Sequence, residues 1–255
     1  MTTTQHTVVG RVNFSADDIF KLIEAKPFLS CSDSELEQLF WTMHPRFRFF
    51  KTVPQNCVFL DIGANNGGLH FWREWGAPKR SDITMYGVDL QHGEHAGHYA
   101  GWESFNLDER QPSFPGVKFD AFYATHLIEH LANLDQFLAY MESASAPGAR
   151  VFFEWPAPRT KDFPSSALLR ERGFDIQTYN FFDDYTHVDT YSLDAIGPKL
   201  EQYGFHVTEI GEIDIGQVAV ECIARGRASN NLTFRQLGLW CATGWSNYVS
   251  ARRQS

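Results

Sequence analysis

Residues 57–69 combine residue types and a spacing that suit the binding of a nucleotide-like ligand. They read CVFLDIGANNGGL, so an apolar run ends at Asp61 and a turn rich in glycine and asparagine follows. Glycine gives a tight bend its backbone freedom, and a helix over residues 68–75 is expected to point its N–H groups back at that bend. Ligands of open α/β sheets bind at the carboxyl ends of the strands, where Asp61 is expected to lie. We interpret this turn as a cofactor-binding crevice.

The turn is not a strict dinucleotide fingerprint, because Asn65 stands where G-x-G-x-x-G requires its second glycine. That glycine lets the backbone approach a pyrophosphate, which a ligand without phosphates does not need. Asp61, Gly63, Asn65 and Gly67 instead resemble the first motif of class I S-adenosylmethionine (SAM)-dependent methyltransferases, with asparagine replacing the middle glycine. The resemblance implies SAM as cofactor and S-adenosylhomocysteine as its product. A strand-to-helix turn without a ligand is the alternative reading of this motif taken alone.

A second acidic residue follows at the spacing of a βαβ unit. Residues 83–90, ITMYGVDL, have the composition of a strand and place Asp89 about 22 residues after Gly67, where a carboxylate can bind ribose hydroxyls. A solvated turn aspartate is the alternative. Residues 105–108, FNLD, resemble the third-strand segment that flanks the adenine in this family. Together the motifs imply a cofactor-binding set of Asp61, Gly63, Ala64, Asn65, Gly67, Asp89, Leu90, Asn106, Leu107 and His126.

A further strand leads into a short loop and an amphipathic helix. Residues 119–131 read FDAFYATHLIEHL, and apolar residues then recur at helical spacing up to Met141. This segment resembles the FD…H-x-x-EHL region of many small-molecule and glycan-directed methyltransferases. The later segments APGARVFFEWP, YTHV and SLDAIGPKLEQYGF extend the resemblance, which spans residues 57–224.

The same residues contain a rival pattern. His126, Glu129 and His130 match the H-x-x-E-H spacing of inverted zinc peptidases, in which two histidines bind zinc and the glutamate activates water. Here the motif begins at a strand end, so His126 is expected to precede the helix, and no motif marks a further acidic ligand. We therefore favour the methyltransferase interpretation and expect no metal site.

The connection at residues 156–191 is long enough to form a substrate lid. Its prolines exclude one continuous helix, although residues 166–172 are expected to form a short one. Its aromatic and acidic side chains suit a small polar organic acceptor, with packing as the alternative role. The candidate acceptor-binding residues are Glu129, His130, Glu154, Tyr179, Asp184 and Tyr185, and a structural role for His130, one turn into the helix, is the alternative.

Methyl transfer depends mainly on alignment, since holding two reactants in line can contribute ~7–11 kcal/mol. A hydroxyl acceptor also needs a general base, and histidine suits that role near neutral pH. His126, at the end of the fourth predicted strand, and His187, in the lid, are the candidate catalytic residues.

Two helix starts precede the crevice. Ser15 with Asp18 and Ser32 with Glu35 have the spacing of capping boxes, each ahead of an apolar-faced helix. They predict an N-terminal helical cap over residues 1–56. Phenylalanines alternate with basic residues at 46–51, which favours packing over ligand contact.

Composition limits the partners. The net charge of −9, without a Lys/Arg cluster, argues against nucleic acid or an anionic membrane as partner. No stretch approaches the ~20 apolar residues of a membrane span, and the first residues lack the pattern of a secretory leader. The cysteines are few and widely spaced, so no disulfide framework is expected. We predict a cytoplasmic protein.

These elements predict one α/β domain with a Rossmann-like, doubly wound, mainly parallel seven-stranded sheet. The resemblance adds an antiparallel last strand. The predicted parts are the helical cap (1–56), a SAM-binding half (57–155), the lid (156–191), and a C-terminal half and tail (192–255). The final strands are expected at residues 206–210 and 217–224, and the tail from residue 225 is expected to pack, with a homodimer contact as one role open to it.

The sequence thus predicts a methyltransferase that moves a methyl group from SAM to an oxygen or nitrogen of a small molecule or sugar. A SAM- or nucleoside-binding regulatory protein without transfer activity is the alternative, and Asp61 and Asp89 do not distinguish the two.

Overall fold

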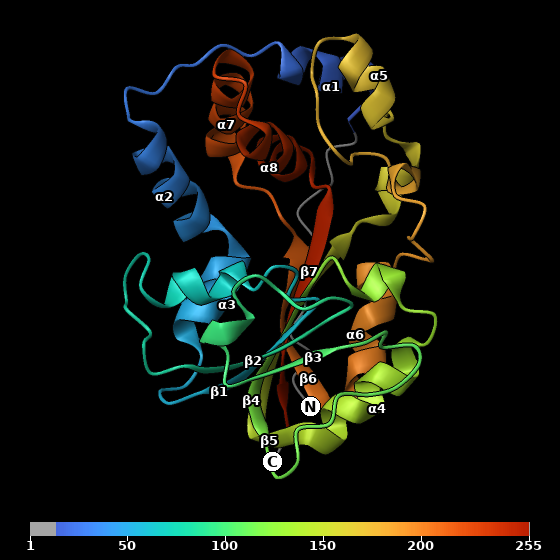
Figure 1. Cartoon of the computed structure of the whole chain (residues 1–255). Helices are drawn as coiled ribbons and strands as arrows, with labels where there is room; N and C mark the ends of the chain where they lie inside the picture. Colours follow the sequence, from blue (N-terminus) through green and yellow to red (C-terminus); the bar gives the residue numbers. More distant parts are fainter. Residues whose placement is uncertain (1–13, 255) are drawn as a thin grey trace, which may run out of the picture.

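The structure is a computed structural model, which describes residues 14–254 of the chain. Its centre is a seven-stranded sheet in the order β3-β2-β1-β4-β5-β7-β6 (Figure 1). Strands β1 to β5 are parallel, and β7 is antiparallel to both β5 and β6. The predicted mainly parallel sheet with an antiparallel last strand is therefore confirmed. The strands are β1 Val58–Ile62, β2 Thr84–Asp89, β3 Gly101–Ser104, β4 Phe119–Thr125, β5 Ser145–Pro156, β6 Phe205–Glu212 and β7 Ser246–Arg253.

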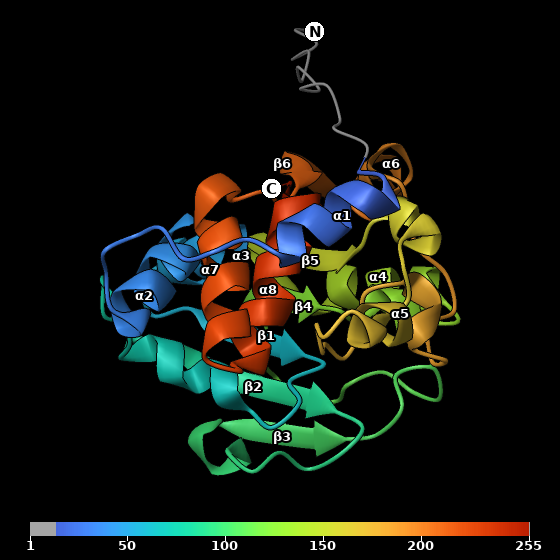
Figure 2. The ribbon, with the colours of Figure 1, turned by 90° about the horizontal axis from the view of Figure 1, so that it is seen from above.

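Helices cover both faces of the sheet, which gives the three layers of an α/β fold (Figure 2). Successive side chains of a strand point to opposite faces, so β1 supplies both cores. Leu60 and Ile62 pack in the core that contains α4 Leu134–Ala144 and α6 Leu193–Gln202. Phe59 packs on the other face, in the core that contains α3 Pro45–Thr52.

The position of the last strand corrects one prediction. Residues 217–224 lie within helix α7 Gly216–Ala228, and the last strand is β7, at Ser246–Arg253. The largely apolar sequence QVAVECIA predicts a strand, but in the structure Val218, Ala219, Cys222 and Ile223 are buried at helical spacing. Strand β7 was missed because its sequence, SNYVSARR, is polar, although most of its residues are buried between β5 and β6.

The tail is an internal part of the fold. After α7 the chain forms α8 Leu232–Thr243 and then enters the sheet as β7 (Figure 1). Trp240 and Trp245 stack on each other with ring centroids 4.1 Å apart. The tail therefore packs into the fold, as predicted, and completes the sheet.

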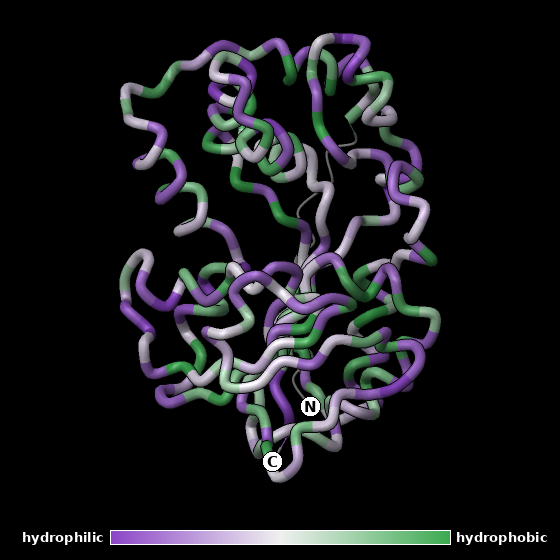
Figure 3. The backbone as a smooth tube through the Cα atoms, viewed as in Figure 1, coloured by the Kyte–Doolittle hydropathy of each residue, from purple (hydrophilic) through white to green (hydrophobic). Residues whose placement is uncertain are grey.

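A helical cap lies at the carboxyl end of β5, where α8 joins the sheet (Figure 1). It consists of α1 Ala16–Ile23, α2 Asp33–Met43, α5 Ser166–Glu171, α7 and α8, in which hydrophobic and hydrophilic residues alternate along the chain (Figure 3). Ile19, Leu169, Ile223 and Leu239 share one apolar cluster. Both predicted capping boxes are present, at Ser15 and Ser32. Residues 1–13 of the predicted cap lie outside the described residues.

Three short elements also differ from the expected ones. The helix predicted after the glycine-rich turn is a 3₁₀ helix, η1 Gly68–Arg73, which ends before Gly76, whose φ is 68°. The helix predicted from the HLIEHL segment is interrupted: η3 Ile128–His130 precedes α4, so His130 does not lie one turn into a long helix. Strand β3 ends at Ser104, so the FNLD segment follows it.

The connection predicted as a lid runs from β5 to α6. It carries η4 Pro158–Asp162, α5 and η5 Phe181–Asp183, so the short helix expected over residues 166–172 is present. Among the helices of residues 14–254, none is long and apolar enough to cross a membrane.

Candidate active site

The glycine-rich loop turns back at the carboxyl ends of β1 and β2. The amides of Gly63 and Ala64 both donate to the carbonyl oxygen of Val88, across 2.9 and 3.0 Å. Gly63 and Gly67 have φ values of 71° and 83°, in the left-handed region that glycine adopts without strain, and Asn65 also has a positive φ of 51°. Asparagine tolerates this region better than most residues, which explains why it can replace the middle glycine of the motif.

Asp61 is buried beneath this loop. The hydroxyl of Tyr99 donates to Asp61 Oδ2 across 2.7 Å and also lies 3.2 Å from the carbonyl oxygen of Gly67. Burial raises the pKa of Asp61 to about 7, although the Tyr99 hydrogen bond opposes this shift. Sequence reasoning missed Tyr99, since nothing in its local sequence distinguishes it from a packing tyrosine.

Asp89 holds the loop in place. Its Oδ2 accepts from the amide of Asn65 across 2.7 Å, and its Oδ1 accepts from the amide of Gln91 across 3.3 Å. Each carboxylate oxygen has two lone pairs, so both can accept a further hydrogen bond from a hydroxyl. Leu90 beside it is 69% exposed.

The two predicted residues beyond β3 occupy different environments. Asn106 is exposed, and its side-chain oxygen accepts from the amide of Asp108. Leu107 is buried in the core with β1 and β4. Neither lines the cavity at the glycine-rich loop.

A cavity of about 290 Å³ lies between the loop and residues from α2, α3 and β4. The predicted residues Asp61, Gly63, Ala64 and Asn65 line it. The residues on its opposite side were not predicted, because they come from helices and a strand far apart in the sequence. The full lining is Trp41, Arg46, Asp61, Gly63, Ala64, Asn65, Asn66, Gly68, Leu69, Trp72, Tyr123 and Thr125.

Arg46 connects this cavity to a buried ion pair. Its Nε and one terminal nitrogen donate to the two carboxylate oxygens of Glu154, across 2.9 and 2.6 Å. His44 positions Arg46, because its Nδ1 caps α3 by accepting from the Arg46 amide across 3.2 Å. Burial lowers the pKa of His44 to about 3, so this ring is neutral and able to accept.

His126 completes the cluster. Its Nε2 lies 3.1 Å from Glu154 Oε1 and 3.0 Å from the Arg46 guanidinium. Arginine can only donate and an ionised carboxylate can only accept, so Nε2 accepts from Arg46 when neutral and donates to Glu154 when protonated. Burial lowers the pKa of His126, but the neighbouring Glu129 and Glu154 outweigh this effect and raise it.

The protonation of Glu154 follows from the same contacts. Burial would raise the pKa of its carboxyl, yet the Arg46 guanidinium and His126 hold that pKa well below its usual range. Glu154 is therefore an ionised, buried carboxylate. On the remaining side, the rings of Trp240 and Trp245 lie 5.1 and 5.4 Å from that of His126.

Glu129, His130 and His187 form a second group of predicted residues that the fold brings together. One ligand-type atom from each lies within 4.8 Å of those of the other two. Glu129 is fully buried, whereas the two histidines are half-buried. None of the three lines the 290 Å³ cavity, but Glu129 Oε1 lies 3.6 Å from His126 Nδ1.

The predicted lid residues divide into exposed and buried ones. Asp184 accepts from both the amide and the hydroxyl of Thr186. Tyr185 is 96% exposed. Tyr179 is fully buried, stacks on Phe163 and donates to the Thr243 hydroxyl, so it packs the cap and does not line the cavity.

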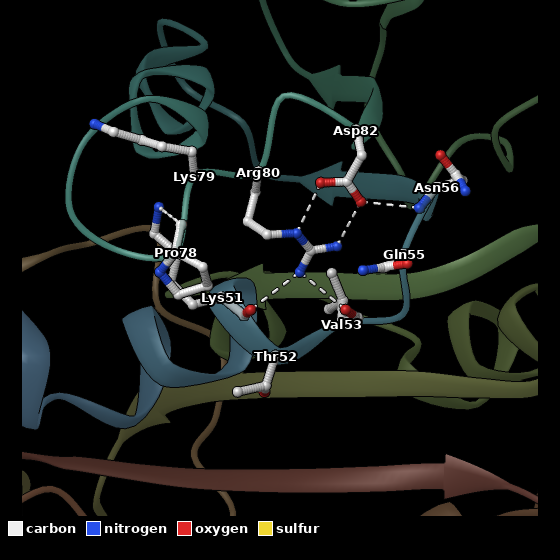
Figure 4. Close-up of a pocket in the computed structure, with 9 residues that line it drawn as sticks. All are labelled: Lys51, Thr52, Val53, Gln55, Asn56, Pro78, Lys79, Arg80 and Asp82. Atoms are coloured by element: carbon white, nitrogen blue, oxygen red, sulfur yellow. Dashed lines mark hydrogen bonds and ion pairs between the residues drawn. The ribbon is translucent and has the colours of Figure 1, made fainter.

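Another pocket, of about 450 Å³, lies at the opposite, amino end of β1 and β2 (Figure 4). Arg80 donates there to both oxygens of Asp82 and to the carbonyl oxygens of Lys51 and Val53 (Figure 4). These bonds join the end of α3 to the start of β2. The Arg80 contacts in this pocket thus have a structural role, and the pocket lies away from the predicted site.

Comparison with known structures supports the fold. A SAM-dependent methyltransferase from Mesorhizobium loti matches with a TM-score of 0.54 and 16% identity over 82% of this chain and 96% of that chain. A methyltransferase from Haloferax volcanii, solved with the Trm112 methyltransferase activator, matches with a TM-score of 0.55 and 14% identity over 88% and 94%. The [4+2]-cyclase SpnF matches with a TM-score of 0.53 and 13% identity over 88% and 84%.

Sequence comparison identifies the family. No curated protein matches the chain significantly. A family model described as a methyltransferase domain matches residues 38–210, which is more than half of the chain and includes the glycine-rich loop, Asp89 and His126. The chain therefore belongs to the methyltransferase domain family of class I proteins, whose cofactor is S-adenosylmethionine and whose cofactor product is S-adenosylhomocysteine.

Proposed function

We propose that this protein transfers a methyl group from SAM to an oxygen or nitrogen atom of a small molecule or sugar. The observation that carries the proposal is the cavity of about 290 Å³, which has the glycine-rich loop on one side and the Arg46–Glu154–His126 cluster beside it. One side offers groups suited to the cofactor, and the adjoining cluster offers a buried acid–base pair.

The residues present fit the cofactor. The Asp61 carboxylate suits the ammonium of the methionine part, and the Arg46 guanidinium at the cavity wall suits its carboxylate. Asp89 retains lone pairs for the ribose hydroxyls. The volume is close to the lower limit of ~300 Å³ for ligand pockets, so the cavity suits the methionine part while the nucleoside would extend toward Asp89.

Alignment accounts for most of the proposed catalysis. Bound SAM would supply an electrophilic methyl group on its sulfonium. The chain needs no covalent nucleophile, because holding the acceptor in line with that methyl group can contribute ~7–11 kcal/mol.

For a hydroxyl acceptor, we assign the proton to His126. The Glu154 carboxylate, 3.1 Å from Nε2, stabilises the imidazolium that forms. The other predicted base, His187, lies beside His130 in the lid, whereas His126 contacts Arg46, which lines the cavity, so His187 is the weaker candidate. An amine acceptor with a free lone pair would not need this step.

The lid supports a small polar acceptor. Its segment near Asp184, Tyr185 and His187 lies beside Glu129 and His130, because two lid amides donate to the carbonyl oxygen of Glu129. Acidic, imidazole and aromatic groups there offer hydrogen-bond acceptors for hydroxyl or amine donors and flat apolar faces for a sugar or aromatic ring.

The proposal is tested by incubating the protein with SAM labelled in its methyl group and a cell extract, which is then separated into small-molecule, protein and nucleic-acid fractions. We expect label in an oxygen- or nitrogen-methylated small molecule, with an Asp89→Ala variant as the cofactor-blocked control. Label in protein or nucleic acid alone would contradict the acceptor class. Tight SAM binding without transfer to any fraction would support the regulatory alternative instead.

A further inference from the structure

Glu129 is a buried carboxyl group that is only partly paired. Its side chain is fully buried, and among the described residues no group donates a hydrogen bond to either carboxylate oxygen. His126 Nδ1 is 3.6 Å from Oε1, within ion-pair distance but beyond hydrogen-bond distance, so His126 is an ionic neighbour of Glu129 and not a hydrogen-bond donor. The second oxygen, Oε2, has no partner among the described residues, and native proteins pair buried carboxylates or use them to coordinate metals.

Two histidines lie close to this carboxylate. His130 lies on the same 3₁₀ helix, and His187 comes from the lid, with the two ring centroids 4.8 Å apart. A ligand-type atom of each histidine and one oxygen of Glu129 all lie within 4.8 Å of one another. A carboxylate and two imidazoles at these separations match the donor number and types of a three-ligand transition-metal site.

Hydrogen bonds fix the tautomer of His187. Its Nδ1 lies 2.5 Å from the carbonyl oxygen of Phe181, and a carbonyl can only accept, so Nδ1 carries the hydrogen. The neutral ring then keeps its lone pair on Nε2. A metal-binding histidine is usually oriented in this way, by a backbone carbonyl that accepts from its second ring nitrogen.

His130 is held in the same way. Its Nδ1 lies 3.2 Å from the carbonyl oxygen of Thr186 and 2.9 Å from the Thr186 hydroxyl. That hydroxyl donates its hydrogen to Asp184 across 2.6 Å, so it can only accept from the histidine. Nδ1 of His130 is therefore the donor, and Nε2 again keeps its lone pair.

The backbone fastens the lid to this group. The carbonyl oxygen of Glu129 accepts from the amides of Val188 and Asp189, across 2.8 and 3.2 Å. These bonds hold His187, the residue before Val188, beside η3, although the two segments are far apart in the sequence. Sites on such fixed elements need little rearrangement to bind a ligand.

We propose that Glu129, His130 and His187 bind a divalent first-row transition metal ion, with Zn²⁺ as the best match to two imidazoles and one carboxylate. The site has three protein ligands, so a fourth position stays open to solvent or substrate. This set differs from the H-x-x-E-H zinc pattern in one ligand. His126, the first histidine of that pattern, contacts Arg46 and Glu154, and His187 takes its place as a ligand. The site also replaces our sequence-based expectation of no metal.

The open position gives the metal a role that rests on the proposed function. A hydroxyl or carbonyl oxygen of the acceptor would bind there, and coordination lowers the pKa of a bound hydroxyl. Acceptors with two neighbouring oxygens could then place one on the metal and the other toward His126. In this arrangement His130 and His187 bind the metal and are not general bases.

A second histidine group provides the matched control. His70, His95 and His98 also place ligand-type atoms within 4.8 Å of one another, but His98 is exposed and the group contains no buried carboxylate. Metal bound there would be retained in Glu129→Gln and lost in His98→Ala. The two variants therefore assign any bound metal to one group or the other.

The test is calorimetric titration of Zn²⁺ into tag-free protein that has been treated with a chelator. We expect one tight site in the parent and in His98→Ala, and affinity at least ~100-fold weaker in Glu129→Gln and His187→Ala. Thr186→Val removes one acceptor for His130 Nδ1 and should weaken binding ~10-fold. X-ray absorption should report two imidazoles and a carboxylate in the parent.

Stability measurements keep the test valid if a variant is poorly folded. Glu129→Gln removes a buried charge, so its metal-free form should melt at or above the parent temperature, while the rise in melting temperature with Zn²⁺ disappears. Parent-like Zn²⁺ affinity in both Glu129→Gln and His187→Ala would overturn the proposal, as would loss of the tight site in His98→Ala alone. These readouts measure no methyl transfer, so they remain informative if the proposed function is wrong.

Discussion

The hydroxyl of Tyr99 donates to the buried carboxyl group of Asp61 across 2.7 Å, beneath the glycine-rich loop. Tyr99 belongs to the connection between β2 and β3, and Asp61 belongs to β1, so this bond ties two elements of the cofactor side together. It also provides Asp61 with a partner while burial raises the pKa of its carboxyl to about 7. The cofactor role that we propose for Asp61 would therefore link cofactor binding to stability through this carboxyl group.

Asp61→Asn should stabilise the cofactor-free protein in a pH-dependent way. Folding raises the pKa of Asp61 from 3.8 to about 7, so between these values the folded protein holds more protons than the unfolded chain. The parent therefore loses stability as pH rises through this window, whereas asparagine does not titrate. The melting-temperature gain of the variant should grow from pH 4 to pH 7 and then level off. A gain that is constant with pH would contradict the raised pKa.

The same variant should bind SAM more weakly. Asparagine keeps an acceptor for Tyr99 but cannot supply the negative charge that suits an ammonium group. Parent affinity should also fall as pH drops below about 7, because Asp61 becomes protonated. Calorimetry at several pH values around 7 would show SAM affinity decreasing with pH in the parent. The variant, which lacks the titrating carboxyl group at position 61, should show little of this decrease.

Tyr99→Phe should destabilise the protein by ~1–3 kcal/mol, since it leaves a buried carboxyl group without its donor. Urea unfolding would measure the loss. Tyr203→Phe is the control, because its hydroxyl donates to Asp135 at the surface and its removal should leave the unfolding free energy nearly unchanged. Equal losses of unfolding free energy in both variants would show that the contact with Asp61 stabilises the protein no more than a surface hydrogen bond does.

Gly67→Ala should be more damaging than Gly116→Ala. Both glycines have positive φ, 83° and 77°, so each substitution costs about 1–2 kcal/mol of backbone strain. A methyl group at Gly67 would also lie 3.2 Å from the His95 backbone and the Tyr99 ring, whereas no atom lies within 4 Å at Gly116. We expect SAM affinity to fall only in Gly67→Ala. Loss of SAM affinity in Gly116→Ala as well would show that both substitutions act through the overall stability of the fold.

His126→Ala should lower turnover ~10²–10⁴-fold on a hydroxyl acceptor and leave SAM affinity nearly intact, because the histidine acts on the acceptor. The substitution should leave the lining of the cavity unchanged, since His126 is not one of the residues that line it. Turnover within threefold of the parent in both His126→Ala and His187→Ala would mean that alignment alone drives the reaction. An amine acceptor would then be favoured.

The parts of the fold that local sequence determines were predicted correctly. The capping boxes at Ser15 and Ser32, strand β1 with Asp61 near its carboxyl end, and strand β2 ending at Asp89 depend on short-range patterns, and they are present. Strand β7 was missed because its burial comes from β5 and β6 on either side and not from its own polar residues.

The residues of the candidate site also divide into those that the local sequence marks and those that only the fold brings together. Asp61 and Asp89 lie at the carboxyl ends of apolar strands, so the local sequence pattern marks them. Arg46 and Tyr99 meet these residues only after the chain folds, and no local pattern separates them from residues with packing roles. His126 and Glu154 were predicted individually, but their 3.1 Å contact depends on the pairing of β4 with β5.

Calorimetric titration with S-adenosylhomocysteine tests the central claim most directly, since it measures the site without needing the acceptor. We predict that one molecule binds per chain with at least micromolar affinity, and that Asp89→Ala weakens binding by ~1.5–3 kcal/mol through lost hydrogen bonds to a charged group. Absence of binding by S-adenosylhomocysteine and SAM, together with tight binding of NAD, would contradict the account.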